Sequence, residues 1–121
     1  MKYSFDNNTP IYIQISNKIR VDILSGKYKH GDKLPSVREF ATTLKVNPNT
    51  IQKSLLDLEN EGLIYTDRTN GKFIIDDQKL INKEKKIVAN EIINNYFKDM
   101  KDIGFNENEA ISFFNGKKGD E

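Results

Sequence analysis

Apolar residues recur every three or four positions in several stretches of the chain, a spacing that places them on one face of a helix. The first stretch follows Thr9-Pro10 and precedes Gly26. Threonine is a common N-cap, proline suits the first helical turn, and glycine commonly follows the last turn. We therefore expect a helix between these signals, with a buried stripe formed by Tyr12, Ile15, Ile19 and Ile23.

Two short helices are predicted next, in close succession. Ser36 with Glu39 three residues later has the pattern of a capping box, which predicts a helix from Val37 to Leu44. Asn47 is a good N-cap and Pro48 fits a first turn, so a second helix should begin there. Two capped helices joined by a short turn match the helix-turn-helix connection. The apolar positions of the second helix are Ile51, Leu55 and Leu58.

A β-hairpin is predicted directly after the second helix, which should end at Gly62. Residues 63–66 and 72–75 have the β-branched and aromatic composition that is typical of strands. Residues 67–71 between them are rich in turn formers, and Asn70-Gly71 is the strongest turn signal. A hairpin after a helix-turn-helix makes the motif winged.

The last third of the chain predicts one long helix and one short helix. The long helix should run from about Gln78 to Ile103, with Gly104 as its stop, and Asn106 with Glu109 should cap the short one. We expect the tail from Gly116 onward to be disordered. The predicted fold class is therefore mostly α with a small β-hairpin. A winged helix-turn-helix domain is expected at residues 1–76, followed by a C-terminal helical dimerisation segment with a disordered tail at residues 77–121.

The apolar side of the long helix is broader than one small domain would cover. Its apolar residues come largely as doublets spaced by four positions, and such a wide stripe must be buried against something. We expect a second copy of the chain to cover it, since helix-turn-helix proteins commonly bind two half-sites as symmetric dimers. The alternative is that this helix packs only on its own winged domain. The predicted dimerisation residues are Val88, Ile92, Ile93, Tyr96, Phe97, Met100 and Ile103.

Composition narrows the classes of protein that fit this pattern. The 19 Lys and Arg residues nearly balance 18 Asp and Glu residues, which neither favours nor excludes nucleic acid, because a local basic face is what neutralises phosphates. With no cysteine and a single histidine, His30, neither a disulfide nor a metal site is expected. No nucleophile motif or phosphate-binding glycine loop suggests an enzyme, and no cofactor is implied. Without a membrane-length apolar run or a signal peptide, we expect a soluble cytoplasmic protein.

The second helix of the helix-turn-helix carries a polar face opposite its apolar one. At 100° per residue, Asn49 and Lys53 lie opposite the apolar stripe and Thr50 lies on its flank. Asparagine can bridge the edge of adenine, lysine can reach guanine or a phosphate, and a helix N-terminus at Asn47 directs N–H groups at phosphate. Any solvated helix also carries polar residues, so this face alone does not settle the function. Further DNA contacts are expected from turns and helix starts, namely Lys33, Ser36, Arg38, Arg68, Asn70, Gly71 and Lys72.

A larger set of residues keeps a recognisable order and spacing between about residues 10 and 75. It comprises Pro10-x-Tyr12-x-Gln14-Ile15, Gly26, Gly31-Asp32-x-Leu34-Pro35-Ser36-x-Arg38, Asn49-Thr50-Ile51, Leu58-x-x-Glu61-Gly62-Leu63-Ile64 and Gly71-x-Phe73-Ile74. This pattern resembles the GntR family of bacterial transcription regulators. The resemblance implies a winged helix-turn-helix that binds operator DNA as a homodimer. It further implies DNA contacts from Arg38, the Asn49-Thr50 pair and Gly71.

Two positions depart from the family pattern. Pro48 stands where many members have a basic residue, and Thr69 stands where the first glycine of the wing is usual, so the base preference is open. The short helical C-terminal segment resembles that of the YtrA branch, in which it serves dimerisation. The leading hypothesis is a homodimeric repressor that binds double-stranded DNA at an inverted-repeat operator. One alternative is a winged-helix protein-interaction module, and another is that a small-molecule effector binds between the C-terminal helices.

Overall fold

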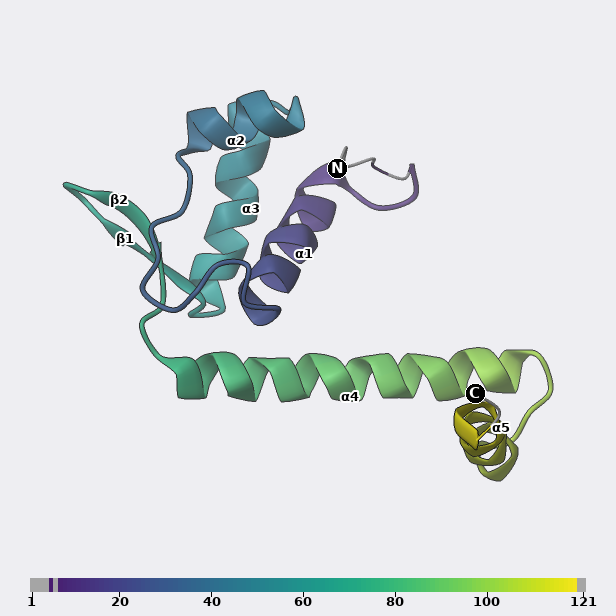
Figure 1. Ribbon diagram of the computed structural model, residues 1–121. Coiled ribbons are helices and arrows are strands. Elements are labelled where there is room, and N and C mark those ends of the chain that lie inside the picture. The colour runs from purple at the N-terminus through teal and green to yellow at the C-terminus, as the bar shows by residue number, and fades with distance from the viewer. Residues whose placement is uncertain (1–4, 6, 120–121) are drawn as a thin grey trace. The chain divides into compact units, whose positions relative to one another are not determined.

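The computed structural model describes residue 5 and residues 7–119. Within them the chain forms α1 (Ile11–Leu24), α2 (Val37–Leu44), α3 (Pro48–Asn60), β1 (Ile64–Asp67), β2 (Gly71–Ile74), α4 (Gln78–Asp102) and α5 (Glu107–Gly119) (Figure 1). This order confirms the predicted fold class. The chain divides into two compact units, Met1–Lys83 and Glu84–Glu121. The boundary between the two units along the chain therefore lies inside α4, whereas the boundary predicted after residue 76 falls in the loop before that helix.

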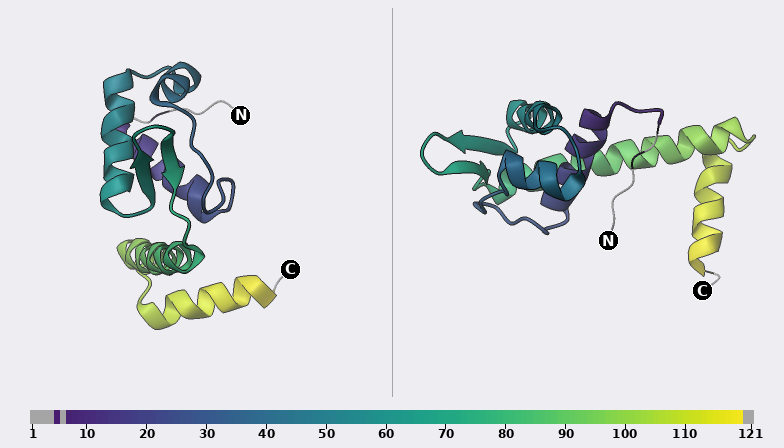
Figure 2. Two further views of the ribbon diagram at one scale, coloured as in Figure 1. Left: turned by 90° about the vertical axis from the view of Figure 1, so that its left-hand side faces the viewer. Right: turned by 90° about the horizontal axis from the view of Figure 1, so that it is seen from above.

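The first unit is built around the packing of α1 against α3. These two helices lie side by side, and α2 crosses the N-terminal end of α3 (Figure 1; Figure 2). The predicted stripe of α1 is buried at Ile15, Ile19 and Ile23, while Tyr12 is only half-buried. The other fully buried apolar side chains of this unit are Ile51, Leu55, Leu58, Leu63 and Ile74. The core therefore joins α1, α3 and the base of the hairpin.

The start of α1 differs from the prediction. Pro10 rather than Thr9 occupies the N-cap position, and no side chain caps this end. Gln14, one turn inside the helix, donates a hydrogen bond from its side-chain amide to the carbonyl oxygen of Thr9 at 2.7 Å. The end of the helix agrees with the prediction, because Gly26 follows it with a φ of 88°.

The hairpin is tied to the loop that precedes α2. Strands β1 and β2 are antiparallel and pair Ile64 with Ile74 at the base and Asp67 with Gly71 at the tip. The loop adds a bridge between Lys33 and Phe73, and the backbone N–H of Leu34 donates to the carbonyl oxygen of Lys72 at 2.9 Å. This third extended segment places the residues before α2 beside the wing.

The second unit consists of the rest of α4 and α5. Helix α4 ends at Asp102, one residue before the predicted end at Ile103, and Gly104 follows with a φ of 102°. Asn106 and Glu109 cap α5 reciprocally: the Asn106 side chain accepts from the backbone N–H of Glu109 at 2.8 Å, and the Glu109 carboxylate accepts from that of Asn106 at 3.0 Å. Helix α5 continues to Gly119, whereas the sequence predicted a disordered tail from Gly116 onward. Residues 120–121 lie outside the described part of the chain.

Candidate nucleic-acid interface

Helix α3 exposes a polar face because its opposite face is fixed in the core. Its predicted N-cap is confirmed, since the Asn47 side chain accepts a hydrogen bond from the backbone N–H of Asn49 at 2.8 Å. Pro48 occupies the first turn, where its missing N–H has no intrahelical partner to lose. The buried face holds Ile51, Ser54, Leu55 and Leu58. The exposed face holds Asn49, Gln52, Lys53 and Leu56.

A groove of about 480 Å³ runs between the start of α2, the exposed face of α3 and strand β2. It brings together three of the residues predicted to contact DNA, Asn49, Lys53 and Lys72. The sequence prediction omitted the groove residues Gln52 and Glu59 and left Leu56, which is 54% exposed, without a role. Their spacing was the available signal, because Asn49, Gln52, Leu56 and Glu59 follow one helical stripe at steps of three and four residues.

The chemistry of this groove suits the edge of a base pair. Amide side chains such as Asn49 and Gln52 offer a donor and an acceptor at once, which is the pattern that pairs with adenine in the major groove. Leu56 provides an apolar surface of the kind that contacts the methyl group of thymine. The groove can therefore form both polar and apolar contacts with DNA.

Lys53 is held in place by an aromatic ring. Its ammonium nitrogen lies 3.8 Å from the centre of the Tyr12 ring on α1, which is a cation–π contact. Such a contact orients the ammonium group without neutralising its charge. Lys53 therefore remains able to attract a phosphate from the α1 side of the groove.

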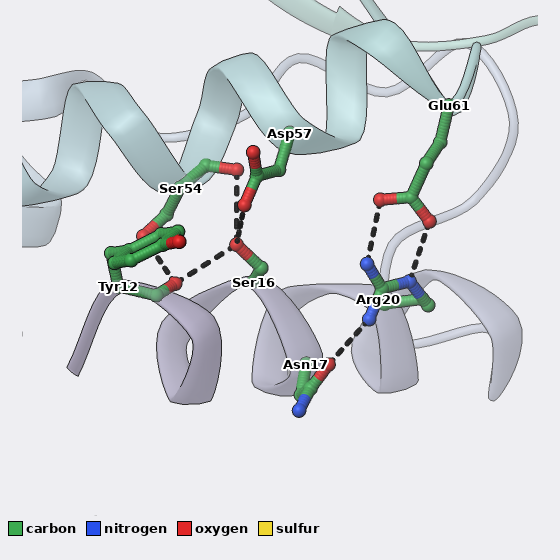
Figure 3. Close-up of polar contacts among 7 residues, drawn as sticks. All are labelled: Tyr12, Ser16, Asn17, Arg20, Ser54, Asp57 and Glu61. Carbon is green, nitrogen blue, oxygen red and sulfur yellow. Dashed lines mark hydrogen bonds and ion pairs between the residues drawn. The ribbon is translucent and has the colours of Figure 1, made fainter. Parts of the chain in front are cut away.

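Buried polar contacts between α1 and α3 fix how α3 is rotated (Figure 3). The Ser54 hydroxyl donates across the interface to the carbonyl oxygen of Tyr12 at 2.7 Å. The Ser16 oxygen lies 2.9 Å from the same carbonyl oxygen, 3.2 Å from that of Ser54 and 3.3 Å from a carboxylate oxygen of Asp57. Serine is small enough for the helices to approach closely, and its buried hydroxyl requires these partners. A rotation of α3 about its axis would break the cluster, so the polar face keeps its direction.

An ion pair adds a second tie at the other end of the two helices (Figure 3). Two nitrogens of the Arg20 guanidinium donate to the two carboxylate oxygens of Glu61, at 2.9 and 2.6 Å. A third nitrogen interaction, at 2.6 Å, holds Arg20 to the side-chain oxygen of Asn17. The bidentate geometry fixes distance and direction together. It anchors the C-terminal end of α3 where the chain turns into the wing.

The tip of the wing is organised by Asp67. Its carboxylate accepts hydrogen bonds from the backbone N–H groups of Thr69 and Asn70, at 2.9 and 3.2 Å. These bonds, with that of Thr69 the stronger cause, hold the pKa of Asp67 below its usual value. Arg68 and Asn70 are exposed at this tip, and Gly71 has a φ of 105° beside the side chain of Lys33.

The start of α2 lies on the other side of the groove. The predicted capping box is confirmed: Ser36 Oγ accepts from the backbone N–H of Glu39 at 3.1 Å, and the Glu39 carboxylate accepts from the backbone N–H of Ser36 at 3.0 Å. The bond from the Ser36 backbone is the main cause that lowers the pKa of Glu39 from its usual value. Arg38 is exposed, and its side chain forms no ion pair or hydrogen bond with the described residues.

The predicted dimerisation residues are partly exposed on the second unit. Ile92, Ile93 and Ile103 are exposed by 64%, 50% and 71%, while Val88, Tyr96, Phe97 and Met100 are half-buried. Helix α5 contributes apolar residues that the prediction left out of this surface. A groove of about 400 Å³ between α4 and α5 is lined by Ile92, Ile93, Tyr96, Phe97, Ile111 and Phe114.

Two further features bear on other classes of site. His30 is exposed, and its Nδ1 lies 2.6 Å from a carboxylate oxygen of Asp76. Among the residues that the structure describes, no group of three or more His, Cys, Asp or Glu side chains could hold a metal ion. Within the same residues, no helix is long and apolar enough to cross a membrane.

A helix-turn-helix with a hairpin wing and an exposed second helix defines the winged helix class of nucleic-acid-binding proteins. Residues 11–74 match the family described as "Bacterial regulatory proteins, gntR family". The chain belongs to this GntR family. It is accordingly a DNA-binding regulator of transcription and not an enzyme. Membership of this family decides against the alternative of a winged-helix module that only binds other proteins.

Relatives and solved structures extend this similarity over most of the chain. The chain is 36% identical over 111 residues to the uncharacterized HTH-type transcriptional regulator YhcF of Bacillus subtilis, covering 92% of each chain. It is 46% identical over 81 residues to the HTH-type transcriptional repressor YtrA of the same species, covering 67% of this chain and 62% of YtrA. A GntR family transcriptional regulator from Listeria monocytogenes has a TM-score of 0.85 and 39% identity, covering 93% of this chain and 98% of that one. The DNA-binding domain of AraR, solved in complex with operator ORX1, has a TM-score of 0.56 and 29% identity, covering 59% of this chain and 92% of that one.

Proposed function

We propose that the chain is a homodimeric repressor that binds an inverted-repeat operator through the groove on its winged unit. The observation that carries this proposal is the exposed polar stripe of α3, which shares one groove with the start of α2 and the wing. Resemblance to YtrA, named a repressor, and to AraR, solved with an operator, supports both the DNA partner and negative regulation. The protein would act in the cytoplasm, where bacterial DNA lies.

We assign base contacts to the N-terminal half of α3 and backbone contacts to its surroundings. Asn49, Thr50 and Lys53 would enter the major groove, as the N-terminal residues of a recognition helix do. Arg38 is an exposed cation without a protein partner among the described residues, so it can bind a phosphate or a guanine edge. The remaining proposed contacts are Lys33, Ser36, Asn47, Arg68, Asn70 and Gly71. Lys72, which the sequence also predicted as a contact, lines the groove but lies 3.5 Å from a carboxylate oxygen of Glu59, so we leave it out of this set.

Selection of bound fragments from random duplex DNA tests this assignment. We expect the recovered sequences to converge on an inverted repeat. Arg38→Ala should then weaken binding to that repeat by about tenfold, which is the scale of one lost charged contact. Thr42→Ala, an exposed substitution on the same helix, serves as the control. Recovery of sequences with no common motif, or equal affinity of Arg38→Ala and the parent, would count against the proposal.

We propose that the second unit forms the dimer. A helical pair of this size cannot bury a core of its own, because small units expose most of their apolar surface. Of its residues with described side chains, only Ala110 is buried, beside the hydrogen bond of 2.6 Å from the Tyr96 hydroxyl to the Ala110 carbonyl oxygen. The groove between α4 and α5 has purely apolar side chains apart from that hydroxyl, which suits another copy of the chain better than a polar effector.

Light scattering after size exclusion tests the dimer. Ile93→Glu places a carboxylate in the apolar groove, and we expect it to convert the dimer into a monomer. Asn94→Glu adds the same charge one residue later, 100° further around α4 and outside the groove lining, and should leave the dimer intact. A parent chain that runs as a monomer at micromolar concentration would rule out this arrangement.

A further inference from the structure

A closed set of polar contacts joins the end of α3 to both strands of the wing. The ammonium group of Lys72 on β2 donates to the Thr66 hydroxyl oxygen on β1 at 2.6 Å. The Thr66 hydroxyl in turn donates to one carboxylate oxygen of Glu59 on α3 at 2.7 Å. The other carboxylate oxygen of Glu59 lies 3.5 Å from the Lys72 nitrogen. Each oxygen of this carboxylate therefore has a partner on the wing.

These contacts use a lysine that lines the candidate DNA groove. Glu59 and Lys72 both line it, and their side chains are only 31% and 25% exposed. The second lysine of the groove, Lys53, contacts an uncharged ring, and among the described residues it forms no ion pair. The groove thus contains one lysine whose charge is balanced by a carboxylate and one whose charge is not.

We infer that Glu59 is a specificity-determining residue, which holds Lys72 away from DNA phosphates and so suppresses binding to non-operator DNA. The inference rests on the proposed DNA-binding groove. Non-specific binding to DNA is almost entirely a matter of cations neutralising phosphates. A lysine that is already paired adds little to that binding, and a carboxylate on the groove wall repels any phosphate that comes close. The amide side chains that contact base edges keep their function, so the operator retains its advantage over other sequences.

Glu59→Gln tests this role, because glutamine still accepts a hydrogen bond from Thr66 but carries no charge. We would measure affinity for random-sequence duplex DNA by fluorescence anisotropy over a range of salt concentrations. The released lysine should bind one more phosphate, so the slope of log affinity against log salt should steepen by about 0.9. At low salt the affinity should rise by about fivefold, and the ratio of operator to random-sequence affinity should fall. Glu91→Gln, which removes an exposed carboxylate of α4, should leave the slope at the parent value.

A double variant identifies Lys72 as the released group. Glu59→Gln with Lys72→Gln should return the slope to the parent value, and Lys72→Gln alone should leave that slope unchanged. The inference is overturned if Glu59→Gln binds random DNA with the parent slope, or if the double variant keeps the steeper slope. Should Glu59→Gln fail to fold, Lys72→Gln decides alone, since a slope that becomes shallower by about one would show Lys72 on a phosphate in the parent.

The same titrations separate this inference from the proposed function. If the parent chain binds an operator no better than random DNA, the proposed function fails. If the parent discriminates normally and Glu59→Gln discriminates equally well, only the role of Glu59 fails.

Discussion

At the scale of single residues, the Tyr12 ring determines where the Lys53 ammonium lies. Tyr12→Leu removes the ring but keeps an apolar side chain and the carbonyl oxygen that Ser54 binds. We expect Lys53→Met to reduce the free energy of unfolding more in the parent than in the Tyr12→Leu background. The difference should be about 0.5–1 kcal/mol, which is the strength of an exposed cation–π contact. Urea denaturation of the four variants gives this coupling directly. Tyr12→Phe keeps the ring and should preserve the coupling, whereas equal costs of Lys53→Met in the parent and the leucine background would contradict the prediction.

Gly71 is the residue at which the backbone of the wing depends on glycine. Its φ of 105° lies where side chains are strained, and an added Cβ would lie 3.4 Å from the Lys33 side chain, which is ordinary contact. The strain therefore comes from the backbone rather than from crowding. Gly71→Ala should lower the free energy of unfolding by roughly 1–3 kcal/mol in urea denaturation. Gly116→Ala in α5 meets no such strain and nothing within 4 Å, so a similar loss there would remove the explanation.

At the scale of elements, the capping box makes the stability of α2 depend on pH. Hydrogen bonds lower the pKa of Glu39 in the folded chain from its usual 4.5. A carboxylate with a lowered folded pKa contributes stability that is fully present above the unfolded pKa and is lost as pH falls through the folded value. Stability should therefore decline below about pH 4.5 partly through this group. Glutamine can still accept the bond, so Glu39→Gln should be close to the parent at neutral pH and decline less in acid.

Thermal melts between pH 7 and pH 3 measure this effect. Ser36→Ala provides the matched control, because it removes one bond of the box and should reduce stability by about 1 kcal/mol at neutral pH, while the Glu39 carboxylate keeps its bond from the Ser36 backbone and still titrates in acid. If stability declines in acid equally in Glu39→Gln and in the parent, Glu39 is not a cause of the decline. The wing has a second group of this kind in Asp67, so some acid dependence should survive in every variant.

The helix ends and the contacts between elements show which features could be predicted from neighbouring residues in the sequence. The capping residues Ser36, Glu39 and Asn47 and the stop at Gly104 could be predicted because each acts on neighbours within one helical turn. The start of α1 was mispredicted because Thr9 is a good N-cap in general, whereas the helix here begins after Pro10. The contacts of Glu59 with Lys72 join residues of different elements, and only the fold brings them together.

Prediction from local sequence has the same limit at the candidate DNA-binding site. The helical spacing of α3 correctly predicted that Asn49 and Lys53 are exposed and that Ile51 and Leu55 are buried, because the position of each residue around a helix follows from the sequence alone. It could not show that Lys53 lies on Tyr12 or that Lys72 is paired, since long side chains choose partners from whatever the tertiary structure offers. Family resemblance supplied the DNA partner, which no single helix face establishes.

At the scale of the whole molecule, the proposed symmetric dimer would make DNA binding depend on the phase of the double helix. Two recognition helices held by one dimer must meet two half-sites on the same side of the duplex. Inserting about five base pairs between the half-sites rotates one of them by half a turn, so one of the two α3 helices loses its contacts. We expect this insertion to weaken binding of the parent by at least tenfold, and an insertion of about ten base pairs to restore part of the affinity.

The monomeric variant separates phase from sequence. Ile93→Glu should bind each half-site independently, so its weaker affinity should not change with the insertion, while Asn94→Glu should show the parent's dependence. Anisotropy titrations of the three proteins on the three duplexes give the result. If the parent tolerates the half-turn insertion without loss, the two α3 helices do not act as one rigid pair, and the operator would have to be bound one half-site at a time.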